Sequence, residues 1–335
     1  MNFSPLLRAL LWPFSLLYGA AVRFRAWLYA HAWLRQKRLN GIVISVGNIT
    51  VGGTGKTPMV IWLAERFLAE GKRVAILSRG YRGAVGTSDE IELMKHRLQG
   101  RVLFGVGKDR FAQGSRLEAR DIGIFILDDG FQHLPLARDV DILLIDTMSP
   151  LGQQFLLPAG GLREPVSAIN RADLVVFTRT NHSPAAARAI PELSPLAIPS
   201  FQSTTKLIGF ERYGENSVQR FPEQLSGPFY AFCGIGNPEA FFLDLQEWKI
   251  PVVGRLAFRD HHRYTPADGA HLTKMAATAG ARAFVTTEKD SRNLGEVKFE
   301  RTPVYLARIA LEISGEEELF ALLKSKLPAH RGAAA

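Results

Sequence analysis

The chain has 335 residues, of which 47% are hydrophobic and 22% charged, a composition that predicts packed domains and excludes a generally disordered protein. A single cysteine, Cys233, excludes an internal disulfide and suits a reducing compartment. The net charge of +9 indicates an anionic partner: nucleic acid, an acidic membrane surface or a phosphorylated substrate.

Residues 1–40 combine aromatic and leucine side chains with arginines and lysines, and the first acidic residue of the chain is Glu65. The longest uncharged stretch runs from Ala9 to Val22 and contains Pro13, so it is shorter than the roughly 20 apolar residues that cross a bilayer. We therefore expect a helical segment that lies in the headgroup region of an anionic membrane. The alternative is a pair of helices packed on the protein body.

This segment accounts for much of the basic excess, and the sequence contains neither a zinc-type Cys/His cluster nor an RNA-binding aromatic signature. A nucleic-acid partner is therefore not expected, and no obligate protein partner is inferred.

A glycine-rich segment joins an apolar run at 41–47 to a helical pattern at 58–70. Strand, glycine-rich turn, Gly-Lys-Thr and helix form the arrangement that holds nucleoside triphosphates, because glycines let backbone N–H groups approach phosphates at a helix N-terminus. Lys56 is predicted to reach the β- and γ-phosphates and Thr57 to ligate Mg²⁺. Thr50 replaces the usual first glycine. The expected ATP-binding residues are Thr50, Val51, Gly52, Gly53, Thr54, Gly55, Lys56 and Thr57. A tight turn with an exposed lysine would give the same pattern.

Two further polar segments follow predicted strands. The strand at 73–78 leads to Arg79 and, after Thr87, to Asp89 and Glu90, which could grip phosphate, act as a base or ligate metal. The strand at 122–128 ends in Asp128 and Asp129, which resembles a Walker B element. Either aspartate could hold Mg²⁺, and the sequence does not decide between them.

Strands predicted at 41–47, 73–78, 101–105, 122–128, 140–145 and 173–178 alternate with helices at 58–70, 108–120 and 165–171. Apolar strands that alternate with helices indicate a parallel sheet covered on both faces. The segment from Phe201 to Arg212 is interpreted as one arm of a strand pair that joins two lobes.

A second α/β pattern follows, with strands at 228–233, 251–257, 282–287 and 303–309 and helices after Asn237 and at 266–279. It contains Asp260, His261 and His262, where a carboxylate beside an imidazole could handle a proton. The predicted organisation is an N-terminal segment (1–40), a doubly wound P-loop lobe (41–200), linker strands (201–225) and a smaller α/β lobe (226–330).

Together these motifs resemble the tetraacyldisaccharide 4'-kinases of lipid A biosynthesis. The resemblance rests on short segments in the family's order: Gly47–Pro58, Leu77–Tyr81, Asp128–His133, Leu157–Pro165, Gly234–Phe241, Asp260–His262 and Thr286–Asp290.

The resemblance implies transfer of the γ-phosphate of ATP, with Mg²⁺, to the 4'-hydroxyl of a tetraacylated, singly phosphorylated glucosamine disaccharide. It further implies a peripheral enzyme at the cytoplasmic face of the bacterial inner membrane.

It also implies residue roles. Asp89 becomes the catalytic base and His261 its partner from the other lobe, while Lys56 stabilises the transferring phosphoryl group. Thr57, Asp128, Asp129 and Glu90 would surround the metal. The residues expected to position substrate are Asn48, Arg79, Tyr81, Arg163 and Glu164. The family usually has glycine before the Asp-Glu pair, where this chain has Ser88.

A different class of protein, the regulatory or partitioning ATPases, shares the doubly wound fold and a similar phosphate loop. Those proteins carry a lysine immediately before the two glycines, where this chain has Val51. The substitution argues against a dimerising switch.

Overall fold

The computed structural model describes residues 4–80, 88–151, 155–183, 198–215, 219–220, 227–295, 297–299 and 302–328. The predicted site residue Tyr81 lies outside these ranges. The chain is an α/β protein that divides into two compact units. Unit 1 comprises residues 1–87, 94–204 and 312–335, and unit 2 comprises residues 88–93 and 205–311.

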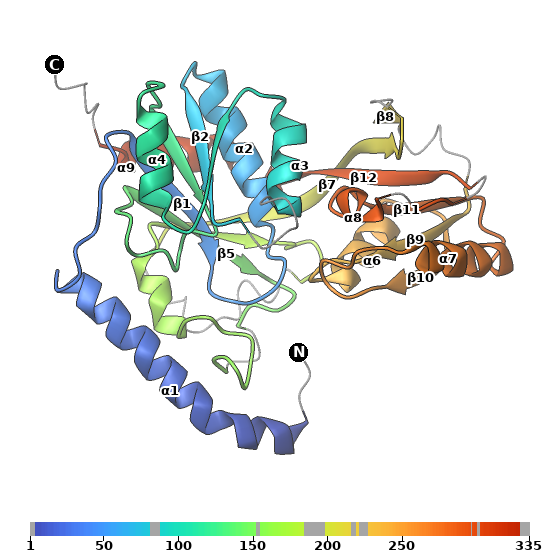
Figure 1. The fold of residues 1–335 in the computed structure, drawn as a ribbon, viewed down its shortest axis with the longest axis horizontal. Helices are drawn as coiled ribbons and strands as arrows, with labels where there is room; N and C mark the ends of the chain where they lie inside the picture. Colours follow the sequence, from blue (N-terminus) through green and yellow to red (C-terminus); the bar gives the residue numbers. More distant parts are fainter. Residues whose placement is uncertain are drawn as a thin grey trace. The chain divides into compact units, whose positions relative to one another are not determined.

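Unit 1 is built on parallel strands in the order β3-β2-β4-β1-β5-β6, followed by the first residues of β7. The strands are β1 (Ile42–Asn48), β2 (Val74–Ser78), β3 (Leu103–Val106), β4 (Ile124–Asp128), β5 (Val140–Asp146), β6 (Leu174–Thr178) and β7 (Ser200–Arg212). Strand β1 pairs with β4 on one side and β5 on the other, so the segments after β1 and β4 leave the same edge of the sheet (Figure 1). Nearly every residue of these central strands is buried, as expected for a parallel sheet covered on both faces.

The helices of unit 1 cover this sheet. Helix α2 (Lys56–Ala69) packs on β1 and β4, and α4 (Arg110–Glu118) packs on β2 and β3. The predicted helix at 165–171 is a 3-10 helix, η2 (Val166–Arg171). Helix α9 (Glu316–Lys326) was not predicted; its Phe320 packs edge-on against Phe67 of α2, and Glu316 accepts a hydrogen bond from the Trp62 indole at 2.9 Å.

Unit 2 carries a second sheet segment in the order β10-β9-β11-β12-β7. Its strands are β9 (Phe229–Cys233), β10 (Val252–Ala257), β11 (Ala283–Thr287) and β12 (Val304–Ile313), and β8 (Gln219–Arg220) pairs antiparallel with β7. Its helices are α6 (Pro238–Glu247), α7 (Pro266–Thr278) and α8 (Ser291–Leu294). An aromatic cluster of Phe232, Tyr264, Phe284 and Phe299 fills the core on one face of this sheet.

Strands β7 and β12 are hydrogen-bonded neighbours, and each has residues in both units. Strand β7 covers the residues of the predicted arm, and it is paired with β12 as well as with β8, which lies within 201–225. The units also differ from the predicted lobes because residues 88–93 group with unit 2 and residues 312–335 with unit 1. Helix α3 (Asp89–Leu98), which was not predicted, begins in unit 2 and ends in unit 1.

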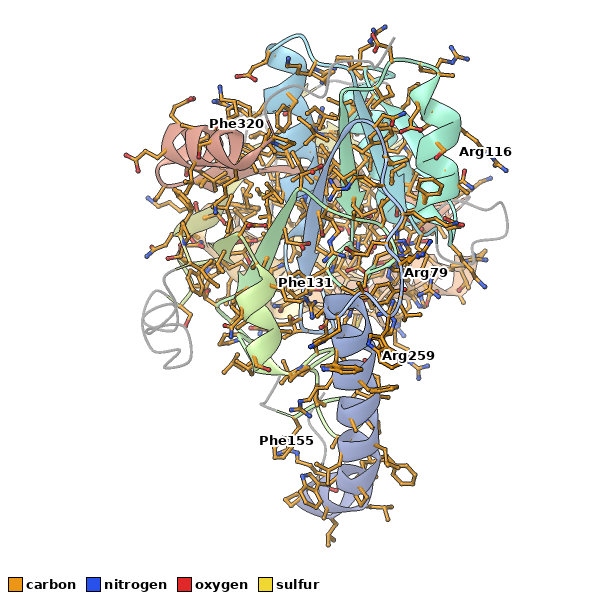
Figure 2. The ribbon with its side chains drawn as sticks, turned by 90° about the vertical axis from the view of Figure 1, so that its left-hand side faces the viewer. Arg79, Arg116, Phe131, Phe155, Arg259 and Phe320 are labelled. Atoms are coloured by element: carbon orange, nitrogen blue, oxygen red, sulfur yellow. The ribbon has the colours of Figure 1, made fainter. Side chains whose placement is uncertain are left out.

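Helix α1 (Pro5–Ala30) forms the N-terminal part of unit 1 as a single helix rather than a helix pair. It is the one helix in the described part of the chain that is long and apolar enough to cross a membrane. Its length and composition thus fit a spanning helix as well as the predicted helix that lies in the headgroup region. Of its residues only Ser15 and Gly19 are buried, and Leu6, Leu10 and Leu17 are each more than two-thirds exposed. Figure 2 shows α1 with side chains projecting on several sides and Phe155 beside its N-terminal half.

Candidate functional site

The glycine-rich segment lies between β1 and α2, as predicted. Gly52 and Gly55 have φ angles of 106° and 85°, which side chains with a Cβ rarely adopt. Gly55 is the N-cap of α2, so Lys56 and Thr57 occupy its first turn. The N-terminus of α2 therefore directs unpaired backbone N–H groups and the positive end of the helix dipole toward the loop. This is the geometry of an anion-binding site.

Hydrogen bonds with two segments, 161–163 and 178–179, fix the loop. The Val51 N–H donates to the Gly161 carbonyl at 2.8 Å, and the Arg163 N–H donates to the Ile49 carbonyl at 2.7 Å. The Thr178 hydroxyl donates to the Thr54 carbonyl at 3.1 Å, and Arg179 donates to the Gly53 carbonyl at 2.8 Å. These contacts occupy loop carbonyls, which favours a loop whose amides serve a ligand.

Lys56 lies among polar side chains at the ends of β1 and β4. Its Nζ is 3.4 Å from Asn48 Oδ1 and 3.5 Å from Asp129 Oδ1. Asp129 also accepts hydrogen bonds from Arg163 Nη1 on both oxygens at 2.9 Å. Burial would raise the pKa of Asp129, but Lys56 and Arg163 outweigh it and hold this pKa below its ordinary value. The carboxylate is therefore ionised and bridges two cations.

Asp128 has different surroundings. Its Oδ2 accepts a hydrogen bond from the Ser78 hydroxyl at 3.0 Å, and its side chain is buried at the end of β4. The carbonyl of Asp128 accepts from Arg110 at 3.3 Å. Strands β2 and β4 are parallel neighbours, which explains why the last residues of both meet.

Arg110 also donates to His133 Nδ1 at 3.0 Å. A guanidinium can only donate, so Nδ1 must be the unprotonated nitrogen of a neutral ring. Burial and the nearby Arg110 lower the pKa of His133 to about 4.

Two buried polar atoms beside the loop have no hydrogen-bond partner among the described residues: Asn48 Nδ2 and Thr54 Oγ1. Buried polar atoms normally have partners, so such atoms mark places where a ligand or water is expected. An amide donor and a hydroxyl beside exposed loop amides fit phosphate oxygens.

Glu164, which was predicted to position substrate, is buried and bonded to other side chains of unit 1. It pairs with Arg171 at 2.6 Å and accepts from Gln132 at 3.0 Å. Gln132 in turn donates to the carbonyl of Asn48 at 2.8 Å. Arg79, by contrast, is exposed at the end of β2.

A second polar cluster lies entirely in unit 2. His261 Nδ1 is 3.0 Å from Asp89 Oδ2, and Asn293 Nδ2 donates to the same oxygen at 2.8 Å. Because a carboxylate only accepts, His261 carries its proton on Nδ1. The hydrogen bond from His261 lowers the pKa of Asp89 against the effect of burial, and Asn293 adds to the decrease. The same bond raises the pKa of His261.

Glu90, the next residue, pairs with Lys289 at 2.7 Å and lies 3.8 Å from His261 Nε2. Burial would raise the pKa of Glu90, but Lys289 reverses the direction and lowers it. The pKa of Lys289 is raised because Glu90 outweighs the effect of burial. Asp89 and Glu90 stand in the first turn of α3, where the helix dipole also favours negative charge.

The buried carboxylate of Asp290 helps to position His261 and Asn293, the two residues that bond Asp89. It accepts hydrogen bonds from the Gly234 N–H and the Tyr264 hydroxyl, both at 2.8 Å. The Gly234 carbonyl accepts from the His261 N–H at 3.0 Å, and Asp290 is the N-cap of α8, which carries Asn293. His261 has a φ of 57°, a strained value for a non-glycine residue.

The structure thus brings Asn48, Lys56, Asp129 and Arg163 together in unit 1, and Asp89, Glu90 and His261 together in unit 2. This corrects the expectation that His261 would reach Asp89 from a different lobe: residues 88–93 group with unit 2 because Asp89 and Glu90 are bonded to His261, Asn293 and Lys289.

Sequence reasoning missed four partners of the site: Ser78, Arg110, Lys289 and Asn293. Lys289 and Asp290 lie in Thr286–Asp290, and Ser78 lies in Leu77–Tyr81, two segments on which the family resemblance rests, so the sequence offered a signal for them. No motif in the sequence indicated a role for Asn293 or Arg110.

Comparisons with known proteins identify the family of the chain. The family model of tetraacyldisaccharide-1-P 4'-kinase (LpxK) matches residues 7–328. The tetraacyldisaccharide 4'-kinase of Geobacter metallireducens is 40% identical over 333 residues, covering 94% of this chain and 96% of that protein. That of Pelobacter propionicus is 40% identical over 344 residues, covering 96% and 93%.

Among solved structures, the Aquifex aeolicus LpxK in complex with ATP has a TM-score of 0.74 and 32% sequence identity, covering 96% of this chain and 99% of that one. The predicted family is confirmed: the chain belongs to the tetraacyldisaccharide 4'-kinase family.

Proposed function

We propose that this kinase transfers the γ-phosphate of ATP to the 4'-hydroxyl of a tetraacylated glucosamine disaccharide 1-phosphate, with unit 1 binding the nucleotide and unit 2 supplying the base. In this reading unit 1 is the doubly wound P-loop lobe, unit 2 the smaller α/β lobe, and β7 with β12 the linker strands. The observation that carries the proposal is the anion-binding loop between β1 and α2, with Lys56 in the first turn of the helix.

ATP is proposed to bind through residues 50–57. The backbone amides of the loop and the α2 N-terminus would receive the phosphates, and the unpartnered Asn48 Nδ2 and Thr54 Oγ1 would gain bonds. Lys56 would leave Asp129 and neutralise charge on the transferring group. Phosphoryl transfer depends mainly on positioning and such charge stabilisation.

The residues present fit Mg²⁺, which prefers hard oxygen ligands. We propose Thr57 and Asp128 as its protein ligands, because Thr57 lies in the first turn of α2, after the phosphate loop, and Asp128 ends the strand next to β1. The Asp128 carboxylate also accepts a hydrogen bond from a neutral hydroxyl. Asp129 serves Arg163 and Lys56, so its role is to hold these cations in place. Glu90 stays a metal-ligand prediction. When bound, the metal would neutralise phosphate charge.

Asp89 is proposed to accept the proton of the attacking hydroxyl. His261 and Asn293 both bond Oδ2, which fixes the carboxylate and leaves Oδ1 for the substrate. The lowered pKa keeps the base ionised. Arg79, Tyr81, Arg163, Asn48 and Glu164 are proposed to position substrate or phosphate, with Glu164 acting through Arg171 and Gln132.

Helix α1 is proposed to lie at the anionic cytoplasmic face of the inner membrane. Its exposed leucines and aromatics suit the acyl boundary, and arginines without acidic neighbours suit anionic headgroups. Contacts to unit 1 run along the helix, from Arg8 stacked over Phe155 to Arg25 bonded to the Gln132 carbonyl at 3.1 Å. These contacts attach α1 to its own domain at several points, which favours an interfacial over a spanning placement.

Product analysis tests the proposed function. The full chain is incubated with ATP labelled on the γ-phosphate, Mg²⁺ and the disaccharide lipid, and the lipid fraction is chromatographed. The proposal expects label on the 4'-position of the lipid. Release of free phosphate with unlabelled lipid would favour the ATPase class instead.

A further inference from the structure

One narrow face of α1 contacts the rest of unit 1 through Ser15, Tyr18 and Gly19. Ser15 and Gly19 are its buried residues, and Tyr18 lies between them on the same side. This face packs on residues 155–163 of unit 1.

The contacts are specific. The Ser15 hydroxyl donates to the Leu156 carbonyl at 2.8 Å and accepts from the Ala159 N–H at 2.9 Å. The Tyr18 hydroxyl donates to the Arg163 carbonyl at 2.8 Å. A Cβ on Gly19 would come within 2.6 Å of the Leu156 side chain, so the two segments approach closely.

The same segment also bonds the phosphate loop, through Gly161 and Arg163. Arg163 is fixed at three points: its carbonyl accepts from Tyr18, its N–H donates to Ile49 at the start of the loop, and its guanidinium grips Asp129. Asp129 is in turn 3.5 Å from Lys56. A continuous chain of hydrogen bonds and ion pairs therefore connects Tyr18 to the lysine of the phosphate loop.

We propose that Ser15 and Tyr18 are positioning residues for the nucleotide site, acting through Arg163, so that α1 sets the geometry of the phosphate loop as well as holding the enzyme at the lipid surface. This inference rests on the proposed function. The physical reason is that a segment with bonded backbone on both sides transmits displacement of one side to the other. Loss of the α1 contacts frees Arg163 to leave both Ile49 and Asp129.

Tyr18→Phe tests the inference, because it removes one hydroxyl and keeps the ring. We expect ATP affinity, measured by calorimetry on the full chain, to fall about two- to tenfold, the range of one net hydrogen bond. Partition into vesicles of phosphatidylglycerol and phosphatidylethanolamine is expected to stay at the wild-type level. The matched control is Tyr29→Phe on the same helix, whose hydroxyl has no hydrogen bond among the described residues; it is expected to leave both quantities unchanged.

Ser15→Ala provides a second variant should Tyr18→Phe fold poorly, and the same loss of ATP affinity is expected. Combining Tyr18→Phe with Arg163→Ala separates a positioning role from general stability: the double variant should bind ATP as Arg163→Ala alone does. Wild-type ATP affinity in both Tyr18→Phe and Ser15→Ala, or additive losses with Arg163→Ala, would overturn the inference. Neither result depends on lipid phosphorylation, whose absence in the wild type would instead refute the proposed function.

Discussion

The polar clusters of units 1 and 2 are constructed in different ways. In unit 1, one short segment supplies the loop, the lysine and the helix N-terminus. The neighbouring parallel strand β4 adds Asp128 at its end and Asp129 directly after it. In unit 2, Asp89, His261 and Asn293 come from distant parts of the sequence and meet only through the fold. A nucleotide site can thus be encoded locally, whereas the proposed base depends on tertiary structure.

This comparison predicts that substitutions in the unit 1 cluster reduce both ATP affinity and phosphoryl transfer, whereas substitutions in the unit 2 cluster reduce phosphoryl transfer alone. Lys56→Ala removes the cation that would face the terminal phosphates, and we expect phosphoryl transfer to fall by about a thousandfold or more. ATP affinity should fall as well. The measurement is the steady-state rate with labelled ATP, and the control is Lys274→Ala at an exposed position of α7. Substantial transfer by Lys56→Ala would contradict the proposed role.

Asp89→Asn keeps the shape of the side chain and removes its ability to accept a proton. We expect the transfer rate to fall about a hundred- to thousandfold, the usual contribution of a general base. Glu92→Gln, in the same helix, is the control. A variant that transfers phosphate at nearly the normal rate would remove Asp89 from the base role.

Asn293→Ala sharpens the comparison, because Asn293 touches only the second cluster. Loss of its hydrogen bond to Asp89 Oδ2 is expected to reduce the transfer rate about three- to tenfold, while ATP affinity is unchanged. Thermal unfolding of the variant controls for a general loss of structure. A rate equal to the wild type would show that His261 alone holds the carboxylate.

The smallest expected effect is the contribution of His133, in unit 1, to the pH dependence of the free energy of unfolding. The folded-state pKa of His133 is about 4, below its unfolded value, so the unfolded chain binds this proton first as pH falls. Stability is therefore lost between about pH 6.5 and pH 4, on the order of 1 to 2 kcal/mol after allowance for partial exposure to solvent. Urea unfolding of wild type and His133→Asn across this range measures the difference. Parallel pH profiles would contradict the assignment of a neutral ring.

The comparison also explains what could be read from the sequence. The strands of both units lie close to the predicted ranges because parallel strands buried on both faces are nearly uniformly apolar. Helix α3 was missed because half of its residues are charged and the sequence of the preceding segment is typical of a loop. Asp89 and Glu90 were consequently assigned to the wrong unit, since no local pattern reveals that Lys289 and Asn293 bind them.

The choice between Asp128 and Asp129 as the metal ligand likewise depends on tertiary contacts. Their identical chemistry gave no basis for a choice, and the structure distinguishes them by neighbours that come from other segments, Ser78 for one and Arg163 for the other. Likewise, the composition of residues 1–40 predicted a basic, aromatic helical segment, but not that Ser15 and Tyr18 bond the segment that contacts the phosphate loop.

A single-turnover experiment on Lys56→Ala and Asp89→Asn, with ATP affinity measured on the same samples, tests most directly whether nucleotide binding and proton acceptance are separate. We predict that Asp89→Asn binds ATP as tightly as the wild type and transfers its phosphate to lipid far more slowly, whereas Lys56→Ala loses both properties. Equal loss of ATP affinity in the two variants, or rapid transfer by Asp89→Asn, would contradict this division of labour.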